Sequence, residues 1–589
     1  DEAVEVLKDA GLQVVMGTPT ATPPRWMLDK YPDMLAYDAE GRERGFGSRR
    51  HYCFSHDGYR EEARRIATLF AERYGDKVDA WQTDNEYDCH DTAISYSPNA
   101  AKAFQDWLAQ RYQSPDALNR AWGNVFWSME YRDFAEIGLP NLTVTDPNPA
   151  HVIAFRRFSS DQVVRFNRVQ CEAIRAHSDA PIAHNFMGRI TAFDHYNVSQ
   201  DLDIASWDSY PLGFLMDRNE APEDFKSRFA RQGDPDFQAF HHDLYRTCGA
   251  LRAQEKPQNG RWWVMEQQPG PVNWAPWNPA PLPGMARLWA WEAFAHGAEA
   301  VCYFRWRQAP FAQEQQHSGL KRPDNAPAPG LAEAAQVAHE LAEMPDAETA
   351  PSPVALIFDY DSAYAWEAQP QGKDFDYFHL VFETYRAIRK NGLSIDIIPA
   401  DGADFSAYKL IFAPGLLHLA PERLAALADS GAHVVFGTRT GLKTAEFSTA
   451  VPLGPGIPGL QARVTHVESL PPAHPVKLQG AGHVWKWFEH LEGDADVLLE
   501  TDAGQPVLVS HDRLFYLAGW LDPMTLESTA RLMAIKAGLE PVSLPLDLRV
   551  RDTATHRFWF NYSASSVTYG IAPPEQRVIP AASVVWEPL

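Results

Sequence analysis

Short apolar runs alternate with amphipathic helical patterns through the first 345 residues of the chain. The strand candidates are residues 13–16, 81–85, 182–186, 204–210, 262–266 and 300–304, with 50–54 as a weaker one. Helical patterns cover residues 59–74, 100–112, 153–177, 237–254, 283–296 and 331–344. Strands that alternate with helices over this length predict a parallel sheet, and a TIM (β/α)8 barrel is its closed form.

The strand count is one short of a complete barrel. About seven candidates are present, and the chain opens with a helical pattern at residues 3–10 that would normally follow a first strand. We therefore expect that the first strand is missing from this numbering. Because residue 1 is Asp rather than Met, the sequence leaves a signal peptide upstream as an open alternative.

Two further domains are predicted after a barrel at residues 1–345. Pro- and Ala-rich stretches at 323–329 and 347–353 precede a second alternation of strands and helices. This alternation predicts an open, flavodoxin-like α/β domain at residues 350–540. Its strand candidates are 354–358, 394–398, 409–412 and 433–436, and its helix candidates are 377–390 and 421–430. Short alternating strands at the end of the chain predict a small antiparallel β domain at residues 541–589.

Charge and cysteine content restrict the possible partners. A formal net charge of −24 argues against nucleic acid and against an anionic membrane surface as partners. No stretch is apolar enough to span a membrane. The five cysteines are widely spaced and include no CxxC pair, which predicts reduced thiols in a cytoplasmic protein.

Two strand-like runs each end in a glutamate. Glu86 ends the run 80–86 and Glu266 ends the run 262–266, and polar or turn residues follow both. A carboxylate at the end of a buried strand is costly unless it is paired or has a task. A salt bridge to a neighbour is the structural alternative for each glutamate. Two carboxylates on separate strands of one barrel are also the groups that a glycosidase requires.

Polar and aromatic side chains gather around the first of these glutamates. They are Trp81, Gln82, Asp84, Asn85, Cys89, His90 and Asp91. Because parallel strands in a barrel are usually apolar throughout, this composition predicts a site at the carboxyl end of the strand. Asn85 could hydrogen-bond a sugar hydroxyl, and Glu86 could donate a proton to a leaving oxygen. Trp274, in the loop after Glu266, could either stack on a sugar or pack the loop.

Four longer segments resemble the beta-galactosidases of glycoside hydrolase family 42. They are GTPTATPP at 17–24, SRRHYCF at 48–54, QTDNEY at 82–87 and MEQQPGPVNW at 265–274. These motifs are long and specific, and the order of the two later domains is also that of the family. The resemblance implies a hydrolase of carbohydrate metabolism that needs no cofactor and removes terminal non-reducing beta-D-galactosyl residues.

The resemblance also implies roles for individual residues. Glu86 would be the general acid/base and Glu266 the nucleophile of a retaining mechanism, with their carboxyl groups about 5–5.5 Å apart. Glu86 then needs a raised pKa, whereas Glu266 must stay ionised, which a nearby arginine would favour. Arg50 occupies the family's arginine position, with Arg49 adjacent to it, and Asn85 would bind the sugar 2-hydroxyl.

Further substrate-binding residues come from the same resemblance. Trp127 and Trp274 match subsite aromatics, and Glu314 and His317 match residues that bind the far hydroxyls of galactose. By itself, a Glu–His pair at this spacing would be an ordinary solvated helix face. The family also implies a homotrimer, in which the second domain packs between protomers.

The zinc site of some family members is not expected in this chain. Ser95, Ser97 and Ala100 stand where a cysteine cluster would be, and only Cys53 remains. One thiol cannot form a four-ligand structural zinc site, so the sequence predicts no metal. The second domain carries GTRTG at 437–441, which is neither a dinucleotide nor a phosphate motif, so a structural or subunit-contact role is predicted for that domain.

Two alternatives to a beta-galactosidase stay open. The same chemistry could act on beta-D-fucosides or alpha-L-arabinopyranosides, because both keep the axial hydroxyl arrangement of galactose. A non-catalytic galactoside-binding protein is the other alternative, and the presence of both Glu86 and Glu266 argues against it. The natural linkage and chain length of the substrate depend on loops that the sequence does not describe.

Overall fold

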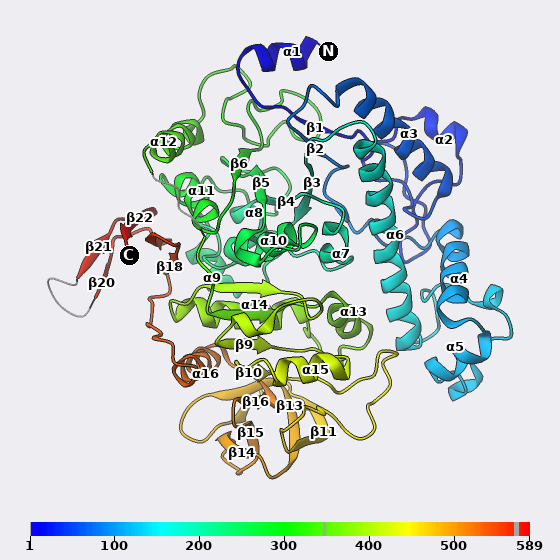
Figure 1. Ribbon diagram of the computed structural model, residues 1–589, viewed down its shortest axis with the longest axis vertical. Helices are drawn as coiled ribbons and strands as arrows, with labels where there is room; N and C mark the ends of the chain where they lie inside the picture. The colour runs from blue at the N-terminus through cyan, green and yellow to red at the C-terminus, as the bar shows by residue number, and fades with distance from the viewer. Residues whose placement is uncertain (1, 345–348, 571–575) are drawn as a thin grey trace. The chain divides into compact units, whose positions relative to one another are not determined.

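The computed structural model describes residues 2–344, 349–570 and 576–589 (Figure 1). Residues 345–348, where the predicted end of the barrel falls, lie outside the described residues. The chain divides into two compact units. The first contains residues 1–205, 360–371 and 442–451, and the second contains 206–359, 372–441 and 452–589.

Six parallel strands follow one another in chain order in a single sheet, β1 to β6. In the first unit, Val15 of β1 lies opposite Ala80 of β2, and Trp81 of β2 lies opposite Ile182 of β3. In the second unit, Trp263 of β5 lies opposite Ala300 of β6. The strands are β1 (Val15–Gly17), β2 (Ala80–Gln82), β3 (Ile182–Met187), β4 (Ile204–Ser209), β5 (Trp262–Gln267) and β6 (Ala300–Tyr303). Parallel strands in sequential order are the arrangement of a (β/α)8 barrel.

The weaker strand candidate at residues 50–54 is wrong. Only a single antiparallel bridge forms there, between Tyr52 and Leu35. Arg50 has a φ of 64°, which interrupts an extended backbone at the start of the segment. The predicted opening helix is confirmed as α1 (Glu2–Asp9).

Helices of the first unit pack around a long central helix, α6 (Pro149–Arg175) (Figure 1). Both α3 (Asp57–Tyr74) and α13 (Tyr360–Ala368) pack on α6, and the Arg157 guanidinium of α6 donates to Asp361 of α13 at 2.7 Å. The other helices of this unit are α2 (Trp26–Lys30), α4 (Pro98–Tyr112), α5 (Pro115–Trp122) and α7 (His195–Ser199). No described helix is both long and apolar enough for a membrane span.

The second unit contains a seven-stranded sheet in the order β14-β15-β16-β10-β9-β7-β8. The predicted strands of the second domain are confirmed as β7 (Val354–Ile357), β8 (Ile395–Ile398), β9 (Leu410–Ala413) and β10 (His433–Phe436). They pair in parallel, and the predicted helices are confirmed as α14 (Tyr377–Lys390) and α15 (Pro421–Ala428). The sequence did not predict the strands that extend this sheet, β14 (Asp496–Glu500), β15 (Pro506–His511) and β16 (Leu514–Leu517).

A separate four-stranded sheet in the second unit was also not predicted. It contains β11 (Ala462–Ser469), β12 (Val476–Lys477), β13 (His483–Gly493) and β17 (Gly519–Leu521). Most side chains of β11 are exposed, so this strand lacks a strong apolar pattern. The remaining helices of the unit are α8 (Pro211–Asp217), α9 (Glu223–Arg228), α10 (Phe237–Leu251), α11 (Met285–Ala295), α12 (Pro329–Glu343) and α16 (Pro523–Lys536).

The predicted antiparallel strands at the end of the chain are confirmed. They are β18 (Leu548–Asp552), β19 (His556–Asn561), β20 (Val567–Tyr569), β21 (Arg577–Ile579) and β22 (Ser583–Pro588). Phe558 of β19 is buried in one apolar cluster with Trp289 and Trp291 of α11. The C-terminal strands therefore cover α11, the helix that follows β5 in the chain.

A buried carboxylate links three elements of the second unit. Asp236, directly before α10, receives two hydrogen bonds of 2.6 Å from Arg549 of β18. Arg386 and Arg389 of α14 lie 3.1 and 3.4 Å from the same carboxylate. Burial opposes the ionisation of Asp236, but the arginines outweigh burial and lower its pKa to about 2.

Replacing Arg549 with Met should destabilise the protein by about 3–5 kcal/mol, because it leaves a buried charge with fewer partners. Urea unfolding of the wild type and the variant measures this difference. The difference should shrink as pH falls from about 4 toward 2, because Asp236 takes up a proton first in the unfolded chain and only near pH 2 in the folded wild type, so the stabilisation by Arg549 is progressively lost. Arg557→Met is the matched control, since the partly exposed pair of Arg557 with Asp552 should contribute about 1 kcal/mol or less. Equal losses in the two variants would contradict this account of Asp236.

Candidate active site

The backbone after β2 turns sharply just where the first glutamate stands. Asp84 and Glu86 have φ angles of 49° and 45°, and Asp88, His90 and Asp91 also have positive φ. Each left-handed residue other than glycine costs on the order of 1–3 kcal/mol and persists only where its surroundings hold it. Such strain concentrates at functional sites, so the segment after β2 is a strong site candidate.

Asn185 of β3 holds this turn in place. Its side-chain oxygen accepts hydrogen bonds from the Glu86 backbone at 3.2 Å and from Gln82 at 2.9 Å. Its amide group donates to Asn85 at 2.9 Å, and Asn85 in turn donates to the Glu86 carboxylate at 3.2 Å. The sequence analysis missed Asn185, although a polar residue inside the buried run 182–186 was a signal for it.

The two adjacent arginines have different partners. Arg49 forms a 2.7 Å ion pair with Glu86. Arg50 lies 3.3 Å from Asp84, and both of these side chains are buried. Burial disfavours the charged form of Arg50, but Asp84 and the other acidic groups around it together outweigh burial and raise the pKa of the guanidinium. Arg49, and not Arg50, is therefore the cation that favours the ionised form of the Glu86 carboxylate.

Asp84 connects the turn to the loop after β1. Its carboxylate accepts hydrogen bonds from Thr20 at 2.6 Å and Tyr52 at 3.1 Å, and its backbone N–H donates to Thr18 at 2.7 Å. The Arg50 guanidinium nitrogens have no hydrogen-bond partner among the described residues. A buried cation held by one ion pair therefore keeps its N–H groups available for a ligand.

The second glutamate is fixed by residues that follow β4. The Tyr210 hydroxyl donates a hydrogen bond to the Glu266 carboxylate. The backbone N–H of Gln268 and the side-chain amide of Gln267 both donate to the Ser209 carbonyl, at 2.9 and 3.3 Å. These bonds hold the end of β5 against the end of β4, and they place Tyr210 beside Glu266.

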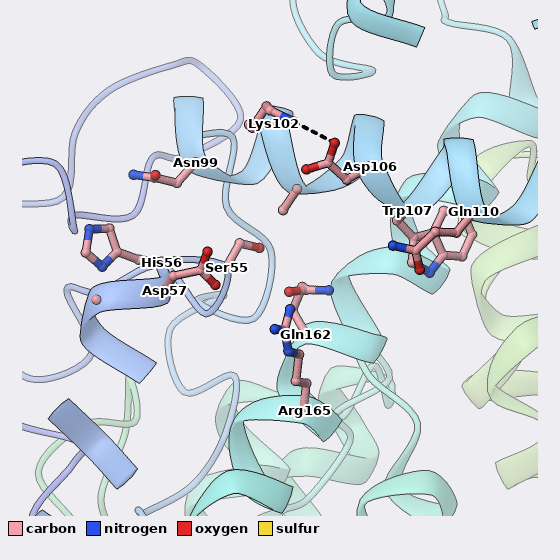
Figure 2. Close-up of a pocket in the computed structure, with 12 residues that line it drawn as sticks. Ser55, His56, Asp57, Asn99, Lys102, Asp106, Trp107, Gln110, Gln162 and Arg165 are labelled. Carbon is pink, nitrogen blue, oxygen red and sulfur yellow. Dashed lines mark hydrogen bonds and ion pairs between the residues drawn. The ribbon is translucent and has the colours of Figure 1, made fainter. Parts of the chain in front are cut away.

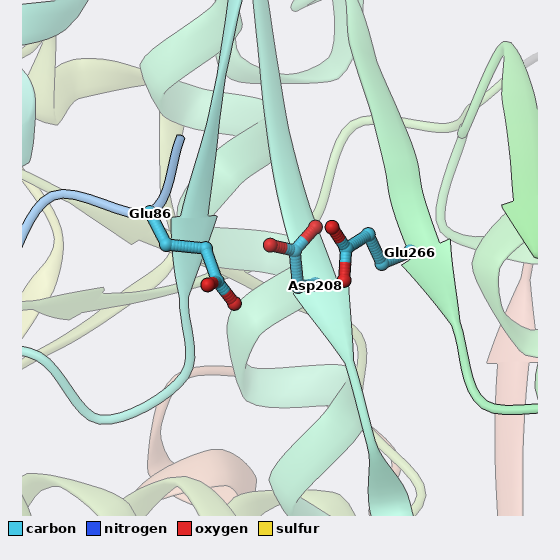
Figure 3. A group of neighbouring side chains, drawn as sticks. All are labelled: Glu86, Asp208 and Glu266. Atoms are coloured by element: carbon cyan, nitrogen blue, oxygen red, sulfur yellow. The ribbon is translucent and has the colours of Figure 1, made fainter. Parts of the chain in front are cut away.

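A third carboxylate, Asp208 of β4, lies near Glu266. One oxygen of Asp208 is within 4.8 Å of one oxygen of Glu266, and Figure 3 draws both side chains together with Glu86. Two carboxylates this close disfavour joint ionisation, so the hydrogen bond from Tyr210 helps to keep Glu266 charged. The sequence analysis missed Asp208 and Tyr210, although both lie in the strand candidate 204–210.

Aromatic side chains surround Tyr210. Trp274 meets it edge-on with ring centroids 5.6 Å apart, and His317 does so at 5.5 Å. A side chain at Gly213 would bring a Cβ within 2.5 Å of the Trp274 ring, so this contact requires glycine. Trp274 is 38% exposed, so it packs the loop and also presents ring surface.

The remaining predicted binding residues, Glu314, His317 and Trp127, lie in a turn and in a short helix. Glu314 and His317 lie in a turn, where the His317 N–H donates to the Glu314 carbonyl at 3.0 Å, and not on a helix. Arg305 lies 3.6 Å from the Glu314 carboxylate. Trp127, in the short 3-10 helix η1 (Phe126–Ser128), is 72% exposed and contacts Phe126 at a centroid distance of 4.9 Å.

The residues at the family's zinc positions make hydrogen bonds of their own. The Ser97 hydroxyl donates to the Cys53 sulfur at 3.3 Å and accepts from the Ala100 N–H at 3.3 Å, which caps α4. The Ser95 hydroxyl accepts from the Tyr37 N–H at 3.2 Å. Hydroxyl and methyl groups around a single thiol do not fit the tetrahedral nitrogen and sulfur ligands that structural zinc requires.

Treatment with a chelator should therefore leave both activity and melting temperature unchanged, because the residues at the family's zinc positions cannot hold a structural zinc ion. Enzyme assays and thermal unfolding before and after dialysis against EDTA measure this. Stoichiometric zinc by elemental analysis, or a fall in melting temperature after chelation, would contradict the prediction.

Comparisons with known proteins agree with the site. The glycoside hydrolase family 42 model, described as beta-galactosidase, matches residues 1–344, and the model described as the beta-galactosidase trimerisation domain matches residues 352–540. The chain belongs to this family. A beta-galactosidase of Thermus thermophilus is 50% identical over 606 residues, which cover all of this chain and 92% of that protein.

Solved structures extend the similarity to the fold. A beta-galactosidase from the psychrophilic Marinomonas ef1 has a TM-score of 0.95 and 46% identity, and covers all of this chain and 91% of the other. The beta-galactosidase of Halorubrum lacusprofundi has a TM-score of 0.93 and 38% identity, over all of this chain and 90% of the other. These relatives confirm the predicted TIM barrel followed by further domains.

Proposed function

We propose that the protein is a retaining beta-galactosidase that hydrolyses terminal non-reducing beta-D-galactosyl residues. The observation that carries this proposal is the position of Glu86 and Glu266, each at the carboxyl end of a parallel strand in the segment matched by the family. Glu86 lies in the segment after β2, and Glu266 is the penultimate residue of β5, directly before Gln267. Catalytic groups of TIM-barrel enzymes lie at this end of the strands.

The reaction proceeds in two displacements. Glu266 attacks the anomeric carbon while Glu86 gives its proton to the glycosidic oxygen, so the leaving alcohol departs and a galactosyl ester forms. Glu86, now ionised, removes a proton from water, and the water oxygen attacks the same carbon and releases Glu266. The acid and the nucleophile are both restored, and the configuration is retained. This mechanism requires carboxyl groups about 5–5.5 Å apart.

The partners of the two glutamates act differently on their roles. The hydrogen bond from Tyr210 stabilises the negative charge that the nucleophile needs against the nearby Asp208. Arg49 favours the ionised form of Glu86, which suits the base of the second step but opposes the protonated form that the first step requires. Asn185 fixes the orientation of the same side chain through its bonds to Asn85 and the Glu86 backbone.

Galactose would be bound by Arg50, Asn85, Trp127, Trp274, Glu314 and His317. The available N–H groups of Arg50 and the partly exposed ring of Trp274 support this assignment. Because Arg50 is buried and charged, hydrogen bonds from it to a sugar hydroxyl would be strong.

Replacing Glu266 with Gln should abolish turnover of nitrophenyl beta-galactoside, because the covalent ester can no longer form. Glu86→Ala should slow substrates with poor leaving groups by about 10²–10⁴-fold and activated ones much less. Added azide should restore turnover in Glu86→Ala and yield beta-galactosyl azide. Glu299→Gln is the matched control, because Glu299 pairs with Arg261 before β6 and should leave the rate unchanged. Full activity of Glu266→Gln, or no azide product from Glu86→Ala, would contradict the roles.

We further propose that the domains at 1–345, 350–540 and 541–589 assemble into a cytoplasmic homotrimer through the barrel and the second domain. The trimerisation-domain match supports the assembly, and five free cysteines support a reducing compartment. An apolar run on the first unit, Val125, Phe126 and Trp127, is 76%, 63% and 72% exposed. Three exposed apolar side chains in a row, of which Phe126 and Trp127 also contact each other, favour a partner contact at this place.

Sedimentation equilibrium should give a mass about three times 66.2 kDa. Phe126→Glu should shift the distribution toward monomers, because it places a charge in the proposed apolar contact. Val578→Glu, at an exposed position of β21 in the last domain, should leave the trimer intact. A wild-type monomer with full activity would overturn the proposed assembly.

A further inference from the structure

A polar cavity away from Glu86 and Glu266 lies within the first unit, between the start of α3 and the helices α4 and α6 (Figure 2). Its volume is about 370 Å³, which is within the range of about 300–1,000 Å³ for small-molecule sites. The lining side chains that matter here are Asp57, Lys102, Asp106, Trp107, Gln162 and Arg165. None of them belongs to the strand ends that carry Glu86 and Glu266.

Gln162 of α6 is the feature that points to a ligand. Its side chain is buried, with only 7% exposed, and its amide oxygen has no hydrogen-bond partner among the described residues. Leaving a buried polar group without a partner costs on the order of 1–3 kcal/mol. Figure 2 shows Gln162 extending from α6 toward α4 at this cavity. A ligand that donates a hydrogen bond to this oxygen would recover the cost.

Three of the four charged side chains around the cavity are already paired. Lys102 pairs with Asp106 at 2.5 Å, and Asp57 pairs with Arg60 of α3. Arg165 is exposed, so its N–H groups are accessible to a ligand. One accessible guanidinium without a cluster of cations or free carboxylates suits a neutral, hydrogen-bonding ligand better than a phosphate or a divalent cation.

Trp107 gives the cavity an aromatic wall. Its N–H is used by Asp161 at 2.8 Å, so the ring contributes apolar surface at the cavity. Amide groups of Gln110 and Asn99 also line the space. An aromatic ring among many hydrogen-bonding groups is the usual composition of a carbohydrate site, because a sugar has both apolar C–H faces and hydroxyl edges.

We propose that this cavity is a second saccharide site that binds a neutral mono- or disaccharide without hydrolysing it. A sugar hydroxyl donates to the Gln162 oxygen, other hydroxyls accept from Arg165, and a C–H face packs on Trp107. The two carboxylates of the lining, Asp57 and Asp106, are engaged in ion pairs, so neither is available as the acid or the nucleophile of glycosidic cleavage. The site would raise the local concentration of substrate or product on the protein surface.

Isothermal titration of the Glu266→Gln protein with lactose tests the proposal, because substrate binds there without turnover. Two sites per chain are expected. Gln162→Met and Arg165→Met, each added to Glu266→Gln, should weaken one of the two sites by at least about tenfold and leave the other unchanged. Arg168→Met is the matched control on α6, because Arg168 pairs with Asp201 and does not line the cavity.

The proposal would be overturned by a single lactose site in the parent protein or by two sites that both variants leave intact. Displacement of lactose from the weaker site by acetate at equal ionic strength would also overturn it, because that result would indicate an anion site. Thermal unfolding of each variant checks that the protein is folded, and Arg165→Met removes only an exposed side chain. A parent protein with no lactose binding at all, but with normal wild-type turnover, would reject this site and leave the proposed hydrolase function intact.

Discussion

A carboxylate at the end of a buried parallel strand must be matched by donors or cations, and this requirement organises the structure around the site. Asp84 meets it with Arg50, Thr20 and Tyr52, which come from two loops far apart in the sequence. Once these loops converge on Asp84, the backbone that follows is held in left-handed conformations that a free chain would avoid. The orientation of Glu86 depends on that constraint.

Buried carboxylates that must be matched by donors or cations also join α10, α14 and β18 of the second unit. Asp236 and Asp243 are buried at α10, and arginines of α14 and β18 surround Asp236. Tyr385 of α14 donates to Asp243 at 2.7 Å. These ion pairs and this hydrogen bond connect α10, a helix of the barrel, with both later domains. Those domains therefore support the scaffold of Glu266 and need no ligand motif of their own.

The sequence predicted the features that depend on local pattern. The apolar runs before Glu86 and Glu266, and the helix at 377–390, are local signals, and the structure has strands and a helix at these places. The strand expected at 50–54 is absent because Arg50 turns back to pair with Asp84, a contact that only the folded chain supplies.

Contacts between strands could not be predicted in the same way. Asn185 and Tyr210 act on residues of neighbouring strands, so their roles depend on strand order and register. Arg49 and Arg50 are neighbours in the sequence, so the sequence does not distinguish their partners. The structure pairs Arg49 with Glu86 and Arg50 with Asp84. The family motifs identified the arginine position, but they could not identify these two partners.

The central claim is that Glu266 forms the covalent intermediate, and trapping that intermediate tests it most directly. The wild-type protein is incubated with 2,4-dinitrophenyl 2-deoxy-2-fluoro-beta-D-galactoside, in which the fluorine slows the second step, and is then digested and sequenced by tandem mass spectrometry. The account predicts one fluorogalactosyl group per active site, on Glu266 in the peptide that contains β5. A label on Asp208 or on Glu86 instead would contradict it.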